Sequence, residues 1–182
     1  ADSAFKSSEV AQTAQLALQH ALFVSLCADG GIEASAAVGH SLGEVAALVC
    51  SGFLSLADGM AVAAIRGRAV DGHCARSNGG MLAVGASAIE ISAEIGETDL
   101  FEIAAENAPR ATVVACADAA SLAAAKVALE RAFGKVTVLA VTTGFHSRGV
   151  DAALPALRAG IDALRFPRAA PKMACISALT AA

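Results

Sequence analysis

The chain has 182 residues, which is long enough to bury a core as one domain or as one domain carrying a small insert. Hydrophobic residues make up 56% and charged residues 16%, a composition typical of a folded globular chain. The net charge of -4, with no basic run and neither Tyr nor Trp, disfavours nucleic-acid binding. No apolar stretch is long enough to span a membrane, and no secretory leader is evident, so we expect no membrane association. Five scattered cysteines without a C-x-x-C spacing indicate a reducing cytoplasm, and neither a disulfide framework nor a metal site.

The chain begins with a predicted helix over 8–28, ended by the glycines that follow Asp29. A short buried strand is predicted over 35–38. A second helix is predicted over 44–50, with Gly52 in the position of a left-handed cap.

The sequence Gly39-His40-Ser41-Leu42-Gly43 stands between that strand and that helix. Strand, G-x-S-x-G and helix in this order predict a nucleophile elbow, in which small flanking residues permit a tight turn. Ser41 would lie at a helix N-terminus, where the helix dipole favours negative charge developing on a bound acyl group. A bare G-x-S-x-G is weaker evidence, because it also occurs in plain strand-to-helix turns.

A capping box at Ser55 to Asp58 predicts a third helix, running to about Arg68. Arg66 lies on the flank of the apolar face of this helix, where its guanidinium could bind a carboxylate through two hydrogen bonds. The alternative is that Arg66 and Arg68 are the cations expected in a last helical turn, and the spacing alone favours this second interpretation.

The pattern of predicted secondary structure changes over residues 80–143. Strands are predicted at 81–84, 101–105, 112–117 and 136–141, with helices over 87–95 and 119–133. Ser87 opens the first of these helices, with Glu90 at the capping-box position. The order β-α-β-β-α-β is the signature of a ferredoxin-like unit.

His146 follows in Thr142-Thr143-Gly144-Phe145-His146-Ser147, at the end of the last of these strands. It is placed to act as a general base or to be an ordinary loop histidine, and the sequence does not decide between the two. An amphipathic helix over 150–164 and a last strand over 173–176 complete the expected elements.

Three motifs, Gly39 to Glu44, Arg66-Gly67-Arg68 and Gly144 to Ser147, resemble the acyltransferase domains of fatty acid and polyketide synthases, the malonyl-CoA:acyl carrier protein transacylase family. The resemblance covers nearly the whole chain. It implies an α/β fold with an α/β-hydrolase-like core formed by 1–79 and 144–182, and an inserted ferredoxin-like subdomain over 80–143.

The resemblance also implies a role for each matching residue. Ser41 would be the acylated nucleophile, His146 its general base and the N–H of Leu42 an oxyanion donor. Arg66 would bind the free carboxylate of a malonyl-type unit, which reverses the interpretation from spacing. His40 would line the pocket, and Phe145 would favour malonyl over methylmalonyl because its ring fills the space of an α-methyl branch.

The implied activity transfers a malonyl-type unit from coenzyme A to the phosphopantetheine arm of an acyl carrier protein, through an acyl-serine intermediate and without a bound cofactor. Neighbouring synthase domains are further expected partners. The family's Gly-Gln-Gly loop, which supplies the second oxyanion donor, and the segment that orients the catalytic histidine have no counterpart in the sequence. The chain is therefore expected to lack both ends of the domain.

Two other functions remain open. An esterase or thioesterase of the α/β-hydrolase type would need a carboxylate between Ser41 and His146 in the chain. Its candidates are Asp99 and Asp118, with three glutamates as further candidates: Glu102, Glu106 and Glu130. The other is a catalytically incompetent acyltransferase fragment with a structural role.

Overall fold

A computed structural model describes residues 7–74, 78–96, 98–167, 170–178 and 180. The chain forms two compact units, residues 1–68 with 156–182, and residues 69–155. The second unit contains the whole of the segment 80–143 and extends beyond it in both directions, to Ala69 and to Pro155. Part of the predicted core range 1–79, namely 1–6 and 75–77, lies outside the described residues.

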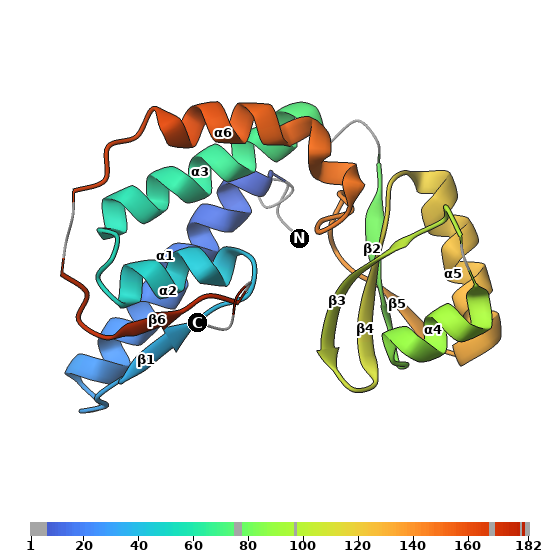
Figure 1. The fold of residues 1–182 in the computed structure, drawn as a ribbon, viewed down its shortest axis with the longest axis horizontal. Coiled ribbons are helices and arrows are strands. Elements are labelled where there is room, and N and C mark those ends of the chain that lie inside the picture. Colours follow the sequence, from blue (N-terminus) through green and yellow to red (C-terminus); the bar gives the residue numbers. More distant parts are fainter. Residues whose placement is uncertain (1–6, 75–77, 97, 168–169, 179, 181–182) are drawn as a thin grey trace. The chain divides into compact units, whose positions relative to one another are not determined.

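The first unit is built from helices and one small sheet (Figure 1). The predicted helices over 8–28 and 44–50 are confirmed as α1 (Ser8–Ala28) and α2 (Leu42–Cys50). Helix α3 (Leu56–His73) starts where the capping box predicted, with the N–H of Asp58 donating to Ser55 Oγ at 3.1 Å. Its predicted end at about Arg68 is wrong, because no glycine cap or proline stops it there and the helix continues to His73.

The strands of the first unit are β1 (Ala36–Val38) and β6 (Ala174–Ile176), which pair in parallel, Val38 opposite Ile176. Both strands were predicted, but the prediction that the first is buried is wrong. Val38 is 66% exposed and Ile176 38%. The two strands pair only with each other among the described residues, so neither is enclosed by neighbouring strands as the inner strands of a parallel sheet are.

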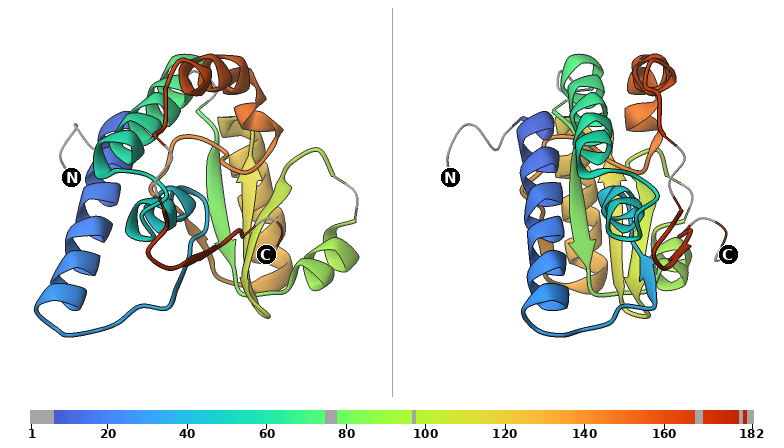
Figure 2. Two further views of the ribbon diagram at one scale, coloured as in Figure 1. Left: turned by 60° about the vertical axis from the view of Figure 1, so that its left-hand side comes forward. Right: turned by 90° about the vertical axis from the view of Figure 1, so that its left-hand side faces the viewer.

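Helices α1, α2 and α3, whose ribbons Figure 2 shows, share one hydrophobic cluster that packs them together. Its buried members are Leu16 on α1, Leu42 and Ala46 on α2, and Ala63 on α3. The side chains Val45 and Met60 pack around them.

Helix α6 (Leu154–Asp162) lies beside α3 (Figure 1), where Gly160 approaches the side chain of Ile65. A single helix over 150–164 was predicted, but a 3₁₀ helix, Arg148–Ala153, precedes α6. Pro155 has no N–H to donate to residue 151, and the N–H of Leu154 bonds instead to the carbonyl of Asp151 three residues back.

Among the described residues, the second unit contains a four-stranded antiparallel sheet, one short α-helix and one longer α-helix (Figure 1). Along the chain its elements are β2 (Gly80–Val84), α4 (Ala88–Ile95), β3 (Glu102–Ala108), β4 (Ala111–Cys116), α5 (Ala119–Phe133) and β5 (Val136–Val138). This confirms the predicted β-α-β-β-α-β order. The strands lie in the order β3-β4-β2-β5, so the two outer strands are the second and the last of the four in the chain.

Alternating residues of β2 and β4 face opposite sides of this sheet, as the period of two in a strand requires. On one side, Leu82, Val84 and Val114 pack against Ile91 of α4 and Leu129 of α5. On the other side lies a smaller cluster of three buried residues: Met81, Val113 and Ala115. The sheet is therefore apolar on both faces.

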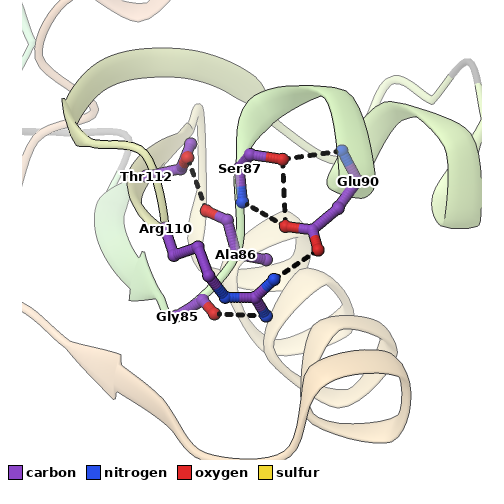
Figure 3. Close-up of polar contacts among 6 residues, drawn as sticks. All are labelled: Gly85, Ala86, Ser87, Glu90, Arg110 and Thr112. Atoms are coloured by element: carbon purple, nitrogen blue, oxygen red, sulfur yellow. Dashed lines mark hydrogen bonds and ion pairs between the residues drawn. The ribbon is translucent and has the colours of Figure 1, made fainter.

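The polar contacts at the start of α4 confirm a predicted capping box (Figure 3). Ser87 Oγ accepts from the N–H of Glu90 at 3.1 Å, and the Glu90 carboxylate accepts from the N–H of Ser87 at 2.8 Å. Arg110, in the β3–β4 turn, pairs with the same carboxylate, and Thr112 Oγ1 donates to the carbonyl of Ala86 at 2.8 Å. These contacts join the hairpin to the helix. Among the described residues, no helix is both long and apolar enough to cross a membrane.

Candidate active site

Ser41 occupies the tight turn between β1 and α2 and is the N-cap residue of α2. Its φ of 57° and ψ of -119° are unusual for a residue with a side chain, and such conformations cost about 1–3 kcal/mol. The turn closes through a hydrogen bond from the N–H of Gly43 to the carbonyl of His40, 2.9 Å long. A side chain on Gly39 would overlap the backbone of Gly43, so the turn requires glycine there. The geometry is that of the predicted nucleophile elbow.

The N–H of Leu42 is the first of α2, and an α-helix leaves its first four N–H groups without an internal partner. Leu42 itself is 5% exposed, because its side chain belongs to the cluster shared by the three helices. Its N–H therefore lies next to Ser41 in a position fixed by packing. His40 is exposed and precedes the turn in the same unit.

Arg66 lies in the interior of α3 rather than in its last turn, so the interpretation as a helix-terminal cation does not hold. Its guanidinium Nη2 donates to Ser41 Oγ over 2.9 Å. The structure thus brings together two residues, 25 positions apart in the chain, that the sequence had singled out separately.

Gln12 on α1 completes this arrangement and was not predicted from the sequence. Arg66 Nη1 donates to Gln12 Oε1 at 2.6 Å, and Gln12 is only 7% exposed. Helix α1 comes this close because Gly67 has no side chain: a Cβ there would overlap the backbone of Glu9. A signal was available, since Gln12 lies one turn before buried Leu16, on the face of α1 that packs inward.

The guanidinium of Arg66 carries a charge that no carboxylate among the described residues neutralises. Burial lowers the pKa of Arg66 from its ordinary value, because a charged group is less well solvated there. Arg68, two residues on, differs in both respects: it is exposed and pairs with Glu9 at 2.6 Å. A partly buried, unpaired guanidinium next to a serine hydroxyl can bind an anion that is attached to that serine.

Phe145 and His146 belong to the second unit. His146 is exposed and has a φ of 59°, and Phe145 packs, partly buried, against the cluster of Met81, Val113 and Ala115. Ser147 Oγ donates to the carbonyl of Gly144 at 2.7 Å and so closes the turn around them. Ser41 and His146 belong to different units, and their pairing stays a prediction.

The carboxylates considered for a hydrolase lie in the second unit with His146, and three of the five have other partners. Asp118 caps α5 by accepting from the N–H of Ser121 at 2.8 Å, which lowers the pKa of its carboxyl group. Glu130 pairs with Lys126 and Glu102 with Arg148.

Comparisons with known proteins agree on one family. The model of the acyl transferase domain matches residues 1–182. The non-reducing polyketide synthase aptA of Emericella nidulans is 38% identical over 149 residues, which is 82% of this chain but only 8% of that synthase.

Two solved structures are similar throughout this chain. The acyltransferase domain from the second module of the salinomycin polyketide synthase has a TM-score of 0.80 at 30% identity, over 97% of this chain and 40% of that one. The malonyl CoA-acyl carrier protein transacylase of Burkholderia pseudomallei has a TM-score of 0.82 at 26% identity, over 97% of this chain and 60% of that one.

Proposed function

The chain belongs to the acyl transferase domain family, and we propose that it moves a malonyl-type unit from coenzyme A to an acyl carrier protein through an ester on Ser41. The observation that carries the proposal is the position of Arg66. Its guanidinium is partly buried, has no carboxylate partner among the described residues, and donates to Ser41 Oγ at 2.9 Å.

The position of the cation favours a short dicarboxylate. In a malonyl ester only one methylene separates the ester carbonyl from the free carboxylate. A cation that binds this carboxylate must therefore lie beside the serine, as Arg66 does. An acyl chain derived from a monocarboxylic acid has no free carboxylate for the guanidinium to bind. The guanidinium then stays partly buried without a counter-ion, which is unfavourable. The same site thus binds the substrate and selects it.

In the first half-reaction Ser41 Oγ attacks the thioester carbonyl of malonyl-CoA while His146 accepts its proton. The oxyanion that forms accepts a hydrogen bond from the N–H of Leu42. Collapse of this intermediate breaks the carbon–sulfur bond, and His146 returns the proton to the sulfur of coenzyme A. In the second half-reaction the phosphopantetheine thiol of the carrier protein attacks the seryl ester by the same route. Arg66 holds the free carboxylate in both halves.

The remaining assignments follow from the same proposal. Residues 1–79 and 144–182 would form the α/β-hydrolase-like core, supported by the strand–elbow–helix sequence around Ser41. Residues 80–143 would form the ferredoxin-like subdomain, supported by its β-α-β-β-α-β order and its antiparallel sheet. His40 would line the pocket, and Phe145 would restrict it to malonyl. No bound cofactor is required, and neighbouring synthase domains are proposed partners because the synthase relative is far longer than this chain.

Intact-protein mass measurement after incubation with malonyl-CoA tests the proposal. We expect a malonyl adduct on the protein and none on Ser41→Ala. Ser35→Ala, at an exposed serine of the same unit, is the matched control and should be acylated like the unsubstituted protein. An adduct that also forms on Ser41→Ala would refute the proposal. An adduct lost to water without any carrier protein would indicate the hydrolase instead.

A further inference from the structure

Gln12 offers a second polar group at the site, which Arg66 does not use. Because a guanidinium only donates hydrogen bonds, the amide oxygen of Gln12 must face it, and this fixes the amide orientation chemically. The Nε2 group therefore lies on the other side of the amide. It is buried and has no hydrogen-bond partner among the described residues.

We propose that Gln12 is the second residue of the carboxylate site: its Oε1 orients Arg66, and its Nε2 donates to the free carboxylate of the substrate. This inference rests on the proposed function. A buried amide N–H₂ without an acceptor is destabilising, and an incoming carboxylate oxygen supplies the missing acceptor. A neutral acyl chain supplies none, so Gln12 adds to the discrimination made by Arg66.

The number of donors and acceptors is consistent with this arrangement. A guanidinium has five N–H donors, of which Gln12 and Ser41 use one on each terminal nitrogen. A carboxylate has two oxygens that together accept about four hydrogen bonds. The three unused N–H donors of Arg66 cannot fill all four acceptor positions of the carboxylate, because they approach it from one side only. Nε2 of Gln12 is a further donor, held next to the same guanidinium.

A purely structural role explains the buried amide less well. Glu9 and Arg68 already join α1 to α3 by an ion pair one turn away. The apolar cluster that includes Leu16 holds the same helices together without polar groups. A leucine in place of Gln12 would serve as a tether at least as well, and would not leave a buried donor unpaired.

Two substitutions at Gln12 test the proposal, with acylation of Ser41 by malonyl-CoA and by acetyl-CoA measured as kcat/KM. Gln12→Glu keeps the shape of the side chain but places a carboxylate next to Arg66. This carboxylate would pair with the guanidinium and repel the free carboxylate of the substrate. Malonyl acylation should fall by about 100-fold or more and acetyl acylation by less than about threefold. Gln12→Leu removes both hydrogen-bonding atoms, and malonyl acylation should fall by about 10- to 100-fold.

Gln15→Glu is the matched control, since it introduces the same charge on the exposed face of α1. It should leave both acylation rates unchanged. A second measurement does not depend on turnover: malonate should raise the melting temperature of the unsubstituted protein and of Gln15→Glu, but not of Gln12→Glu. Acetamide, which has no carboxylate, should raise none of them.

The proposal is overturned if both Gln12 variants keep the malonyl-to-acetyl ratio of the unsubstituted protein, or if both acylation rates fall together. It is also overturned if malonate stabilises Gln12→Glu as well as it stabilises the control. Failure of the proposed function is separate from these results, because the unsubstituted protein itself would then form no malonyl ester on Ser41.

Discussion

Replacing Arg66 by alanine separates the recognition of the carboxylate from the chemistry at the serine. Removing one partner of a buried, hydrogen-bonded charge pair costs about 2–5 kcal/mol. At about 1.4 kcal/mol for each factor of ten, this is a loss of roughly 30- to 4,000-fold. Arg66 is only partly buried, so we expect the lower part of this range for malonyl transfer, about 100-fold. Acetyl transfer loses only the hydrogen bond to Ser41 Oγ and should fall by less than about tenfold.

Folding should be affected much less than malonyl transfer. No carboxylate among the described residues pairs with Arg66, so its removal leaves no buried charge behind. It leaves Gln12 Oε1 without its donor, and we expect the free energy of unfolding to fall by about 1–2 kcal/mol. Urea denaturation of both proteins measures this change.

The assay is the rate of acylation by malonyl-CoA and by acetyl-CoA, followed by intact mass. Arg66→Lys, which keeps the charge but not the planar fork, should give an intermediate malonyl rate. Arg68→Ala is the control on the same helix. Its exposed pair with Glu9 contributes about 0–1 kcal/mol, and both acylation rates should stay within about twofold. Equal losses of malonyl and acetyl transfer in Arg66→Ala would refute the assignment, as would an equal effect of Arg68→Ala.

Two predictions concern the second unit. Ile91 of α4 is fully buried, and its replacement by alanine should lower the free energy of unfolding in urea by about 2–4 kcal/mol. Ile89→Ala, on the same helix but 81% exposed, should change this free energy by about 0.5 kcal/mol or less. Similar losses in both would contradict the assignment of the core. Burial, with a smaller effect from Asp118, raises the pKa of the Cys116 thiol from 9.0 to about 11. The folded chain therefore keeps this proton to a higher pH than the unfolded chain does. As the pH rises from 9 to about 11, the free energy of unfolding should fall by up to about 3 kcal/mol. Cys116→Ala should flatten that fall, and an unchanged slope would refute the argument.

The features predicted well from the sequence were those fixed by nearby residues. The start of α3 follows from Ser55 and Asp58, and the start of α4 from Ser87 and Glu90, because each cap needs only groups three positions apart. The order of strands and helices in the second unit likewise follows from local patterns. The elbow at Ser41 depends on a turn of a few residues and was also predicted.

Features that depend on contacts distant in the chain were predicted less well. The length of α3 was underestimated because two arginines resemble a helix end, and nothing local shows that one of them faces the serine. The exposure of Val38 depends on how many strands join β1, which the sequence of a single strand does not contain. Gln12 lies 54 residues from Arg66, and only the packing of α1 against α3 shows that they meet.

The candidate site and the core of the first unit are parts of one packing arrangement. Gln12 lies one helical turn before Leu16, Ser41 directly precedes Leu42, and Arg66 lies one turn after Ala63. The three apolar residues belong to the same buried cluster. Each polar group of the site is therefore held by a helix whose neighbouring residue is fixed in the core, and no flexible loop intervenes between core and site. This explains how three side chains from three helices can keep hydrogen bonds of 2.6 Å and 2.9 Å around one guanidinium.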